Sequence, residues 1–273
     1  MTGDPPEAAG GGELVVVGCG IQLGRHISRR AESEIRVADR VFALADAFAM
    51  DWLASIRPDC IGLGRHYREG RPDHDRRHAY RAMERELVDA VRDGARVCAV
   101  FYGHPGVFAD VPHGAIRAVR ELGLPARMEP GISADACLYA DLGLDPGRSG
   151  VQSWEATQFL VRDCRPDPSS LLILWQVALA GDLSLTRFHA EPAGLALLVE
   201  KLGRWYRPET EAILYEAAQL PIERFRAERI ALSALPDARF KEYTTLVVPP
   251  AQDAPADVDW LARLGAAPDA LDG

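Results

Sequence analysis

Short apolar runs alternate with helical stretches along most of this sequence, and this alternation restricts the fold more than any other feature. The runs are rich in Val, Leu and Ile and are bounded by Gly or Pro, which is typical of buried strands. The predicted strands are Leu14–Val17, Val41–Leu44, Ile61–Leu63, Val97–Phe101, Leu171–Gln176, Ala212–Ala217 and Tyr243–Val248. The predicted helices are Ser28–Ala38, Asp46–Ile56, Asp75–Asp93, Val111–Leu122, Ala134–Tyr139, Val151–Asp163 and Ala193–Tyr206. Strands that alternate with helices indicate an α/β fold with mostly parallel sheets.

A change in composition near residues 125–131 predicts a division into two domains. We expect an N-terminal α/β domain over residues 13–128 and a C-terminal α/β domain over residues 129–250. Residues 1–12 are rich in Gly, Pro and Ala and are expected to be a disordered tail, and residues 251–273 form a C-terminal tail. A chain of 273 residues is long enough for two such domains. The join between two domains is a frequent place for a ligand cleft.

The charge balance bears on the kinds of partner to expect. The net charge is −9, from 40 acidic and 31 basic residues, whereas proteins that bind nucleic-acid phosphates usually carry an excess of Lys and Arg. The longest apolar run, Leu171–Ala180, is too short to span a bilayer, and the N-terminus does not resemble a signal peptide. We therefore expect neither nucleic acid nor a membrane as a partner.

The cysteines indicate the compartment. There are five, they are scattered, and they form no CxxC pair: Cys19, Cys60, Cys98, Cys137 and Cys164. This pattern predicts neither a zinc site nor a set of disulfides. Free thiols are typical of a reducing compartment, so we expect a cytoplasmic protein that binds no metal.

Two loops with small residues predict a ligand site. The strand Val97–Phe101 ends in the loop Tyr102–Phe108, and a second turn, Pro130–Ala134, places Ser133 at the start of a helix. Ligands of open α/β sheets sit at the carboxyl ends of the strands, so we expect both loops to contact a cofactor. The segment Gly18–Leu23 lacks the third glycine of the dinucleotide-binding fingerprint, which favours an ordinary turn over a phosphate-binding loop.

Three segments together resemble the tetrapyrrole methylase superfamily. They are Tyr102–Phe108, Pro130–Ala134 and Leu174–Gln176. The resemblance implies a methyltransferase of two α/β domains that holds S-adenosyl-L-methionine between them and releases S-adenosyl-L-homocysteine. Two more segments, Ala140–Gly147 and Glu155–Thr157, are similar to borosin peptide α-N-methyltransferases, which methylate backbone amides of a ribosomally made precursor peptide (a RiPP).

The resemblance also implies which residues form the site and which partners the protein has. Catalytic roles are implied for Tyr67, Arg76, Tyr80 and Tyr102. Cofactor contacts are implied for Tyr102, His104, Val107, Ser133, Ala134, Gln176, Ala217, Thr244 and Thr245. A homodimer is implied as well. Fungal borosin enzymes carry their own core peptide at the C-terminus, and residues 251–273 contain no Val- and Ile-rich run. We therefore expect the split, bacterial kind, which modifies a separate precursor with its leader in trans.

The residue types suit this chemistry. An amide nitrogen is a poor nucleophile because its lone pair is delocalised, so its proton must be removed during methylation. Arg76 and Tyr80 are four residues apart on a predicted helix and share a face, where a guanidinium favours the phenolate form of a phenol. We predict Tyr80 as the base and Arg76 as its partner or as the group that stabilises the amide oxygen. Tyr67 and Tyr102 would position the amide and the methyl group, and Arg77 is an alternative to Arg76.

Two other functions remain open at this point. One is a small-molecule methyltransferase that acts on a tetrapyrrole or corrinoid. The segment Gly20–Leu23 stands where pigment-methylating members have a Gly-Pro-Gly-Asp turn, and the acidic charge balance does not suit a substrate with many carboxylates. The other is an inactive peptide-binding scaffold, which would bind the cofactor without methylating any peptide.

Overall fold

The computed structural model describes residues 11–22, 24–68, 76–185, 187 and 189–267. The chain divides into two compact units. The first unit comprises Met1–Leu144, Asp182–Arg187 and Glu216–Arg226, and the second comprises Asp145–Gly181, Phe188–Tyr215 and Ala227–Gly273. The division at residue 144 differs from the expected join at residue 128, because residues 129–144 and two later segments contact the first unit. Most of the expected disordered tail lies outside the described residues.

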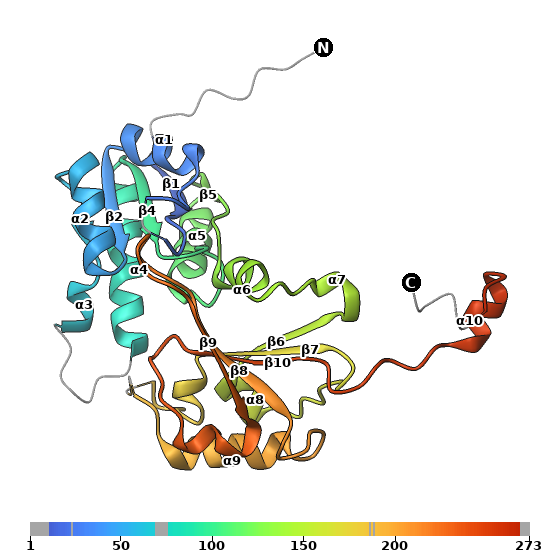
Figure 1. Ribbon diagram of the computed structural model, residues 1–273. Helices are drawn as coiled ribbons and strands as arrows, with labels where there is room; N and C mark the ends of the chain where they lie inside the picture. The colour runs from blue at the N-terminus through green and yellow to red at the C-terminus, as the bar shows by residue number, and fades with distance from the viewer. Residues whose placement is uncertain (1–10, 23, 69–75, 186, 188, 268–273) are drawn as a thin grey trace. The chain divides into compact units, whose positions relative to one another are not determined.

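The first unit is built on a parallel sheet of five strands in the order β3-β2-β4-β1-β5 (Figure 1). The strands are β1 (Glu13–Gly18), β2 (Arg40–Leu44), β3 (Ile61–Gly62), β4 (Arg96–Phe101) and β5 (Ala126–Met128). Four of them were predicted. The fifth, β5, pairs with β1 from Leu14 opposite Ala126, so the segment expected to join two domains is an edge strand of the first sheet.

Helices cover both faces of this sheet (Figure 1). Val15 and Val17 of β1 pack with α1 (Arg29–Val37) and α2 (Ala47–Ile56), and Leu14 and Val16 pack with α4 (Arg76–Arg92) and α5 (Asp110–Glu121). Alternate residues of one strand thus enter two separate cores, which explains the uninterrupted apolar runs. The expected loop at residues 65–74 begins instead as a short helix, α3 (Arg65–Arg68), and residues 69–75 lie outside the described part.

The second unit holds a mixed sheet in the order β6-β7-β10-β8-β9. Its strands are β6 (Val151–Glu155), β7 (Leu171–Trp175), β8 (Glu211–Glu216), β9 (Arg226–Ala231) and β10 (Thr245–Val248). β6 runs parallel to β7, but β10 is antiparallel to both β7 and β8. The α/β class is confirmed, whereas the expectation of parallel strands holds fully only in the first sheet. A strand buried on both faces has the same apolar pattern in either direction.

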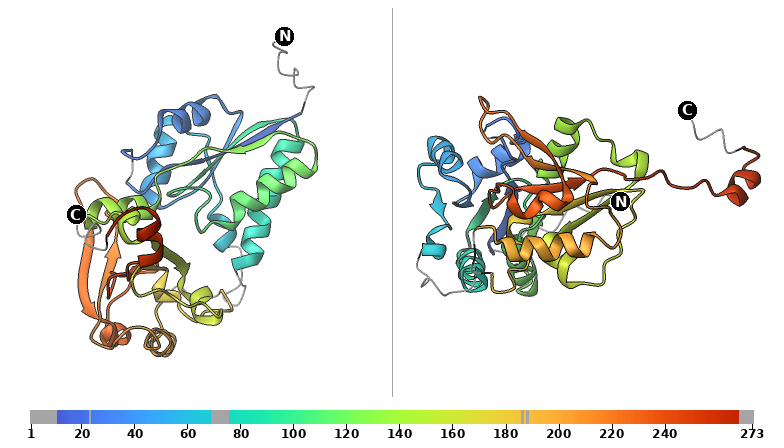
Figure 2. Two further views of the ribbon diagram at one scale, coloured as in Figure 1. Left: turned by 90° about the vertical axis from the view of Figure 1, so that its right-hand side faces the viewer. Right: turned by 60° about the horizontal axis from the view of Figure 1, so that its bottom comes forward.

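Two helices, α8 (Ala156–Val161) and α9 (Pro192–Leu202), pack on one face of the second sheet (Figure 2). The single helix predicted over Val151–Asp163 is wrong, because its first five residues form β6. Glu155 ends that strand, and its carboxylate accepts hydrogen bonds from the backbone N–H of Thr157 and Gln158, so α8 begins there.

The remaining helices are short. They are α6 (Ala134–Leu142) of the first unit, and α7 (Pro146–Ser149), α10 (Val258–Arg263) and the 3-10 helices Val177–Leu179 and Leu232–Asp237 of the second. Within the described ranges, every helix is too short or too polar to cross a bilayer.

Candidate functional site

Three loops at the carboxyl edge of the first sheet meet through glycines. Gly20 and Gly103 exchange backbone hydrogen bonds of 3.2 and 3.0 Å. A Cβ atom on Gly18 would lie 2.2 Å from the carbonyl oxygen of Gly103, and one on Gly131 would lie 2.6 Å from the same oxygen. The loops after β1, β4 and β5 therefore pack backbone against backbone, which a side chain at these positions would prevent.

The loop after β4 is fixed by two histidines. Nδ1 of His104 accepts a hydrogen bond of 2.9 Å from the N–H of Gly106, and Nε2 of His113 lies 3.0 Å from the carbonyl oxygen of Gly106. Because Nδ1 of His104 accepts this hydrogen bond, Nε2 is the ring nitrogen that can donate. His113 was not predicted, since a single histidine on an amphipathic helix gives no signal in the sequence.

A third histidine fixes the turn after β1. Nδ1 of His26 lies 3.3 Å from the N–H of Ile21 and 3.1 Å from that of Gln22. A Cβ on Gly20, which has φ +76°, would lie 2.1 Å from Cβ of His26. These two N–H groups are engaged by the imidazole, so the structure favours the ordinary turn over a phosphate-binding loop.

The third loop leads into α6. Ser133 occupies the N-cap position, but its side chain donates to the carboxylate of Asp135 and makes no capping hydrogen bond. Backbone N–H groups in the first turn of a helix attract anionic groups such as a carboxylate. The predicted cofactor contacts Ser133 and Ala134 lie at this helix start.

Two of the predicted catalytic tyrosines contact each other. The rings of Tyr67 in α3 and Tyr80 in α4 meet edge to face, with centroids 6.2 Å apart and planes at 78°. Partial burial raises the pKa of Tyr67 above its ordinary value, the neighbouring Tyr80 adds to this, and Arg76 opposes it. Tyr67 therefore keeps its proton at neutral pH and is suited to donate a hydrogen bond.

The predicted catalytic arginine begins α4. Nε of Arg76 donates a hydrogen bond of 3.0 Å to the carbonyl oxygen of Leu185, and its side chain is only 13% exposed. The neighbouring Arg77 is exposed. The low exposure of Arg76 and its charge effect on Tyr67 favour Arg76 over Arg77 as the arginine of this cluster.

Topology brings the catalytic candidates to one edge. Tyr102 directly follows β4, and its N–H donates to the carbonyl oxygen of Leu44 at 3.2 Å. Tyr67 follows the carboxyl end of β3, and α4 leads back to the start of β4, so its first residue lies at the carboxyl edge. This is the edge where ligands of parallel α/β sheets bind.

Ala217, another predicted cofactor contact, lies at a cavity of the first unit. The cavity has a volume of about 280 Å³. Its lining residues come from the turn after β1, the loop after β5, α6 and the segment after β8: Gln22, His26, Ile132, Ala136, Cys137, Ala140, Asp141, Ala217 and Ala218. Val107 of the loop after β4 is exposed.

The other three predicted cofactor contacts belong to the second unit. Gln176 follows β7 in the left-handed conformation, with φ +52°. The carbonyl oxygen of Thr244 accepts from the N–H of Val177 at 3.1 Å, and its hydroxyl accepts from the N–H of Lys241 at 2.8 Å. Thr245 opposes Tyr215 in the sheet. Gln176 and the two threonines thus lie close together at the ends of β7 and β10.

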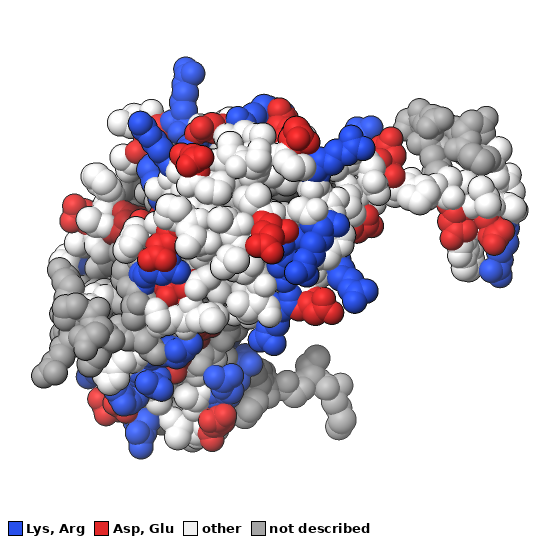
Figure 3. Space-filling view, turned by 90° about the horizontal axis from the view of Figure 1, so that it is seen from below, with Lys and Arg blue, Asp and Glu red and all other residues white. Residues whose placement is uncertain are grey.

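The described residues contain no group of three or more His, Cys, Asp or Glu side chains arranged to hold a metal ion. The five cysteines are free thiols. On the face drawn in Figure 3, Lys and Arg side chains are interspersed with Asp and Glu. Such mixing of signs is typical of a solvated protein surface.

Comparison with known proteins yields relatives of this chain among fungal proteins. It is 35% identical over 260 residues to a methyltransferase/ribosomally synthesized cyclic peptide gymnopeptides precursor of Gymnopus fusipes, covering 93% of this chain and 61% of that protein. It is 34% identical over 265 residues to a methyltransferase/ribosomally synthesized type I borosin cyclic peptide precursor of Serendipita vermifera subsp. bescii, covering 94% of this chain and 64% of that one. The chain thus spans less than two thirds of the length of these curated relatives.

Solved structures share the fold at lower identity. Uroporphyrin-III-C-methyltransferase from Thermus thermophilus matches with a TM-score of 0.62 and 21% identity, over 89% of this chain and 93% of that one. Diphthine synthase matches with a TM-score of 0.59 and 19% identity, over 89% and 91%. Residues 13–232 match the family described as Tetrapyrrole (Corrin/Porphyrin) Methylases. The chain therefore belongs to the tetrapyrrole methylase family.

Proposed function

We propose that the protein is an S-adenosyl-L-methionine-dependent methyltransferase that methylates backbone amide nitrogens of a peptide. The observation that carries the proposal is the cluster of Tyr67, Arg76 and Tyr80, which combines a protonated phenol, a second phenol and a guanidinium at the carboxyl edge of the first sheet. The names of the fungal relatives, which join methyltransferase and borosin or cyclic peptide precursor in one protein, support it.

The proposed cofactor contacts of the first unit are Tyr102, His104, Val107, Ser133, Ala134 and Ala217. In the second unit, the proposed cofactor contacts are Gln176, Thr244 and Thr245. The glycines of the three loops permit close approach of a ligand to the backbone, and the start of α6 carries the carboxylate of Asp135, which accepts a hydrogen bond of 2.7 Å from the N–H of Ala136. When bound, S-adenosyl-L-methionine supplies an electrophilic methyl group on a sulfonium.

The proposed mechanism assigns a task to each catalytic residue. Tyr80, as a phenolate, would accept the amide proton as the bond from the nitrogen to the methyl group forms and the methyl–sulfur bond breaks, which would leave S-adenosyl-L-homocysteine. Arg76 stabilises the negative charge on the phenolate of Tyr80 or on the amide oxygen. Tyr67, which keeps its proton, donates a hydrogen bond that orients the amide, and Tyr102 positions the methyl group.

The substrate is proposed to be a separate precursor peptide with its leader, and the active form a homodimer. The fungal relatives are named as methyltransferase and precursor at once, which supports the peptide substrate. The resemblance to borosin enzymes supports the dimer, which light scattering coupled to gel filtration measures directly.

The test of the function is incubation with S-adenosyl-L-methionine and the peptide encoded by a small reading frame beside the gene. We expect mass increments of one methyl group, and fragmentation should place them on backbone nitrogens. Binding of the cofactor without any mass gain would favour the inactive scaffold. Methylation of a porphyrinogen instead of the peptide would favour the tetrapyrrole enzyme.

A substitution in the glycine contact tests the cofactor site. Gly131→Ala would place a Cβ 2.6 Å from the carbonyl oxygen of Gly103 and push two loops apart. We expect the Kd for S-adenosyl-L-methionine, measured by calorimetry, to rise at least about tenfold. Gly64→Ala is the matched control, because no atom lies within 4 Å of its added Cβ. Equal affinities of the two variants would contradict the proposed site.

The two adjacent arginines make a second test. Arg76→Ala is expected to lower kcat for peptide methylation by about 10²–10³-fold, because it removes a preorganised donor from the reacting amide. Arg77→Ala is the control and is expected to change kcat by less than about twofold, as for other exposed positions. The reverse order of effects would assign the catalytic role to Arg77.

A further inference from the structure

Asp182 organises a short loop that belongs to the first unit, although the residues on either side of the loop belong to the second. Its side chain is buried, with 2% exposed. Oδ1 accepts hydrogen bonds from the hydroxyl of Ser184 at 2.6 Å, from the N–H of Ser184 at 3.2 Å and from the N–H of Leu185 at 3.1 Å. Oδ2 accepts from the N–H of Arg187 at 3.1 Å. The carboxylate of Asp182 thus fixes the backbone at Ser184, Leu185 and Arg187.

The loop presents one carbonyl group to Arg76. Leu185 has φ +58°, a left-handed conformation that a leucine adopts only when its surroundings impose it. Its carbonyl oxygen accepts from the backbone N–H of Arg76 at 3.3 Å and from Nε of the same residue at 3.0 Å. The first N–H groups of a helix have no partner within the helix, so this oxygen fixes both the start of α4 and the guanidinium.

Charge acts in the same direction as the hydrogen bonds. Oδ2 of Asp182 lies 3.7 Å from Nη2 of Arg76, and Oδ1 lies 3.7 Å from Nε of Arg187. Burial opposes ionisation of Asp182, but hydrogen bonds from Ser184 and Arg187 and the charges of both arginines outweigh it and hold its pKa below the ordinary value. The carboxylate is therefore ionised at neutral pH and attracts the guanidinium of Arg76.

We infer that Asp182 is a positioning residue, which holds the guanidinium of Arg76 beside Tyr67 and Tyr80 through the carbonyl group of Leu185. The inference rests on the proposed catalytic role of Arg76. A loop that Asp182 merely stabilises would lose stability on substitution without a specific effect on Arg76. The two roles of Asp182 therefore predict different kinetics in a protein that lacks Arg76.

The test is a double-mutant cycle on kcat with Asp182→Ala, Arg76→Ala and the double variant. Asp182→Ala is expected to lower kcat by up to about 10²-fold while KM for the peptide changes little, because Arg76 is displaced. In the Arg76→Ala background the same substitution should lower kcat by less than about twofold. Asp182→Asn keeps one hydrogen-bond acceptor for the loop, so this variant controls for misfolding. It should lower kcat by less than Asp182→Ala does.

A matched control is available in the second unit. Oδ1 of Asp167 accepts from the N–H and the hydroxyl of Ser169 at 2.9 and 2.8 Å, which is the same local motif. Unlike Asp182, Asp167 pairs with no arginine among the residues that the structure describes. Asp167→Asn is therefore expected to leave kcat unchanged, so this variant should behave as the wild type does in the double-mutant cycle.

A second readout does not depend on activity. In the wild type, the Nε–H of Arg76 should give a protected signal in a proton–nitrogen correlation spectrum, assigned by its absence in Arg76→Lys. In Asp182→Ala its exchange with solvent should accelerate roughly tenfold, as expected for loss of about one hydrogen bond. Unchanged exchange, or additive effects on kcat, would overturn the inference. An unaffected kcat in Arg76→Ala would instead overturn the proposed role of Arg76.

Discussion

Tyr80→Phe is expected to lower kcat for peptide methylation by about 10²–10⁴-fold, the usual contribution of a general base. The ring remains, so its edge-to-face contact with Tyr67 and the packing of α4 should persist. The substitution removes the phenolic oxygen, which is the proposed acceptor of the amide proton and also takes part in a hydrogen bond with Tyr67. Single-turnover kinetics with saturating S-adenosyl-L-methionine, read by mass spectrometry, measure the change in the chemical step.

The control for this variant is Tyr206→Phe. Within the described residues the hydroxyl of Tyr206 is buried without a hydrogen-bond partner, so its removal should leave both stability and kcat close to the wild type. If Tyr80→Phe and Tyr206→Phe methylate the peptide at the same rate, Tyr80 is not the base.

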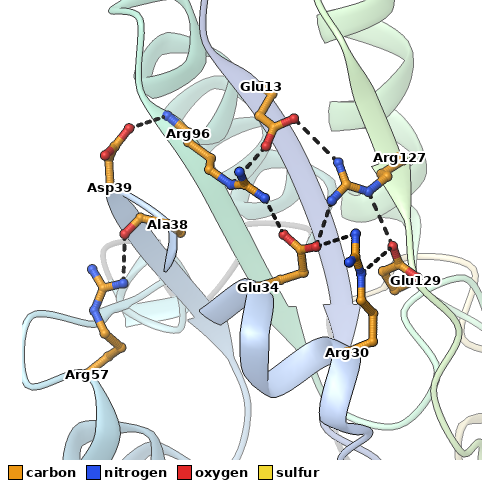
Figure 4. Close-up of polar contacts among 9 residues, drawn as sticks. All are labelled: Glu13, Arg30, Glu34, Ala38, Asp39, Arg57, Arg96, Arg127 and Glu129. Carbon is orange, nitrogen blue, oxygen red and sulfur yellow. Dashed lines mark hydrogen bonds and ion pairs between the residues drawn. The ribbon is translucent and has the colours of Figure 1, made fainter. Parts of the chain in front are cut away.

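Glu34→Ala is expected to lower the free energy of unfolding by about 1–3 kcal/mol. Glu34 of α1 is buried, and its carboxylate lies 2.7 Å from Arg30, 2.7 Å from Arg96 and 2.8 Å from Arg127 (Figure 4). Without it, guanidinium groups that are partly withdrawn from water lose their central counter-charge. Urea denaturation followed by circular dichroism measures the loss.

Glu32→Gln is the matched control for this prediction. Glu32 lies on the same helix with its side chain 37% exposed, and it pairs with Arg36 at 2.6 Å. Exposed pairs of this kind contribute about 0.2–1 kcal/mol, so the variant should unfold near the wild-type midpoint. Equal destabilisation by the two variants would contradict the importance assigned to the buried carboxylate.

Lowering the pH should also show how much the Glu34 carboxylate contributes to stability. Burial opposes ionisation of Glu34, but Arg96, Arg127 and Arg30 outweigh it and hold its pKa below the ordinary value. A group with a lowered pKa in the folded state stabilises the protein above its unfolded pKa, and this contribution disappears as the pH falls through the folded value. The wild type should therefore lose its stability advantage over Glu34→Gln on acidification, and parallel pH curves would contradict this.

The sequence predicts the strands and helices whose burial produces a regular pattern of apolar residues along the chain. β1 and β4 are continuous apolar runs because each enters two cores. β5 has only three residues, and half of β9 is exposed, with charged side chains among its residues, so neither has the pattern of a buried strand. In β6 the residues have no regular alternation of burial, so the sequence pattern does not separate this strand from the helix that follows it.

The candidate site likewise has parts that the sequence predicts and parts that it does not. Glycine and proline residues predicted the loops Tyr102–Phe108 and Pro130–Ala134, because local turn chemistry fixes them. The contact of Arg76 with Leu185 joins residues 109 positions apart, and no local pattern reports it. The segment Asp182–Ser184 is typical of a side-chain-closed turn, but that pattern predicts only the turn and not the arginine it serves.

The discontinuous make-up of the first unit has a consequence for biosynthesis. Its last segment ends at Arg226, so a chain emerging from the ribosome can assemble the parallel sheet early but cannot complete this unit until most of the second has also been translated. Translation from Arg76 to Leu185 takes on the order of 10 s. During this time the start of α4 lacks the carbonyl group of Leu185 as a hydrogen-bond acceptor. A gene fragment that stops at residue 144 would thus encode the first sheet without the segments Asp182–Arg187 and Glu216–Arg226, which complete its unit.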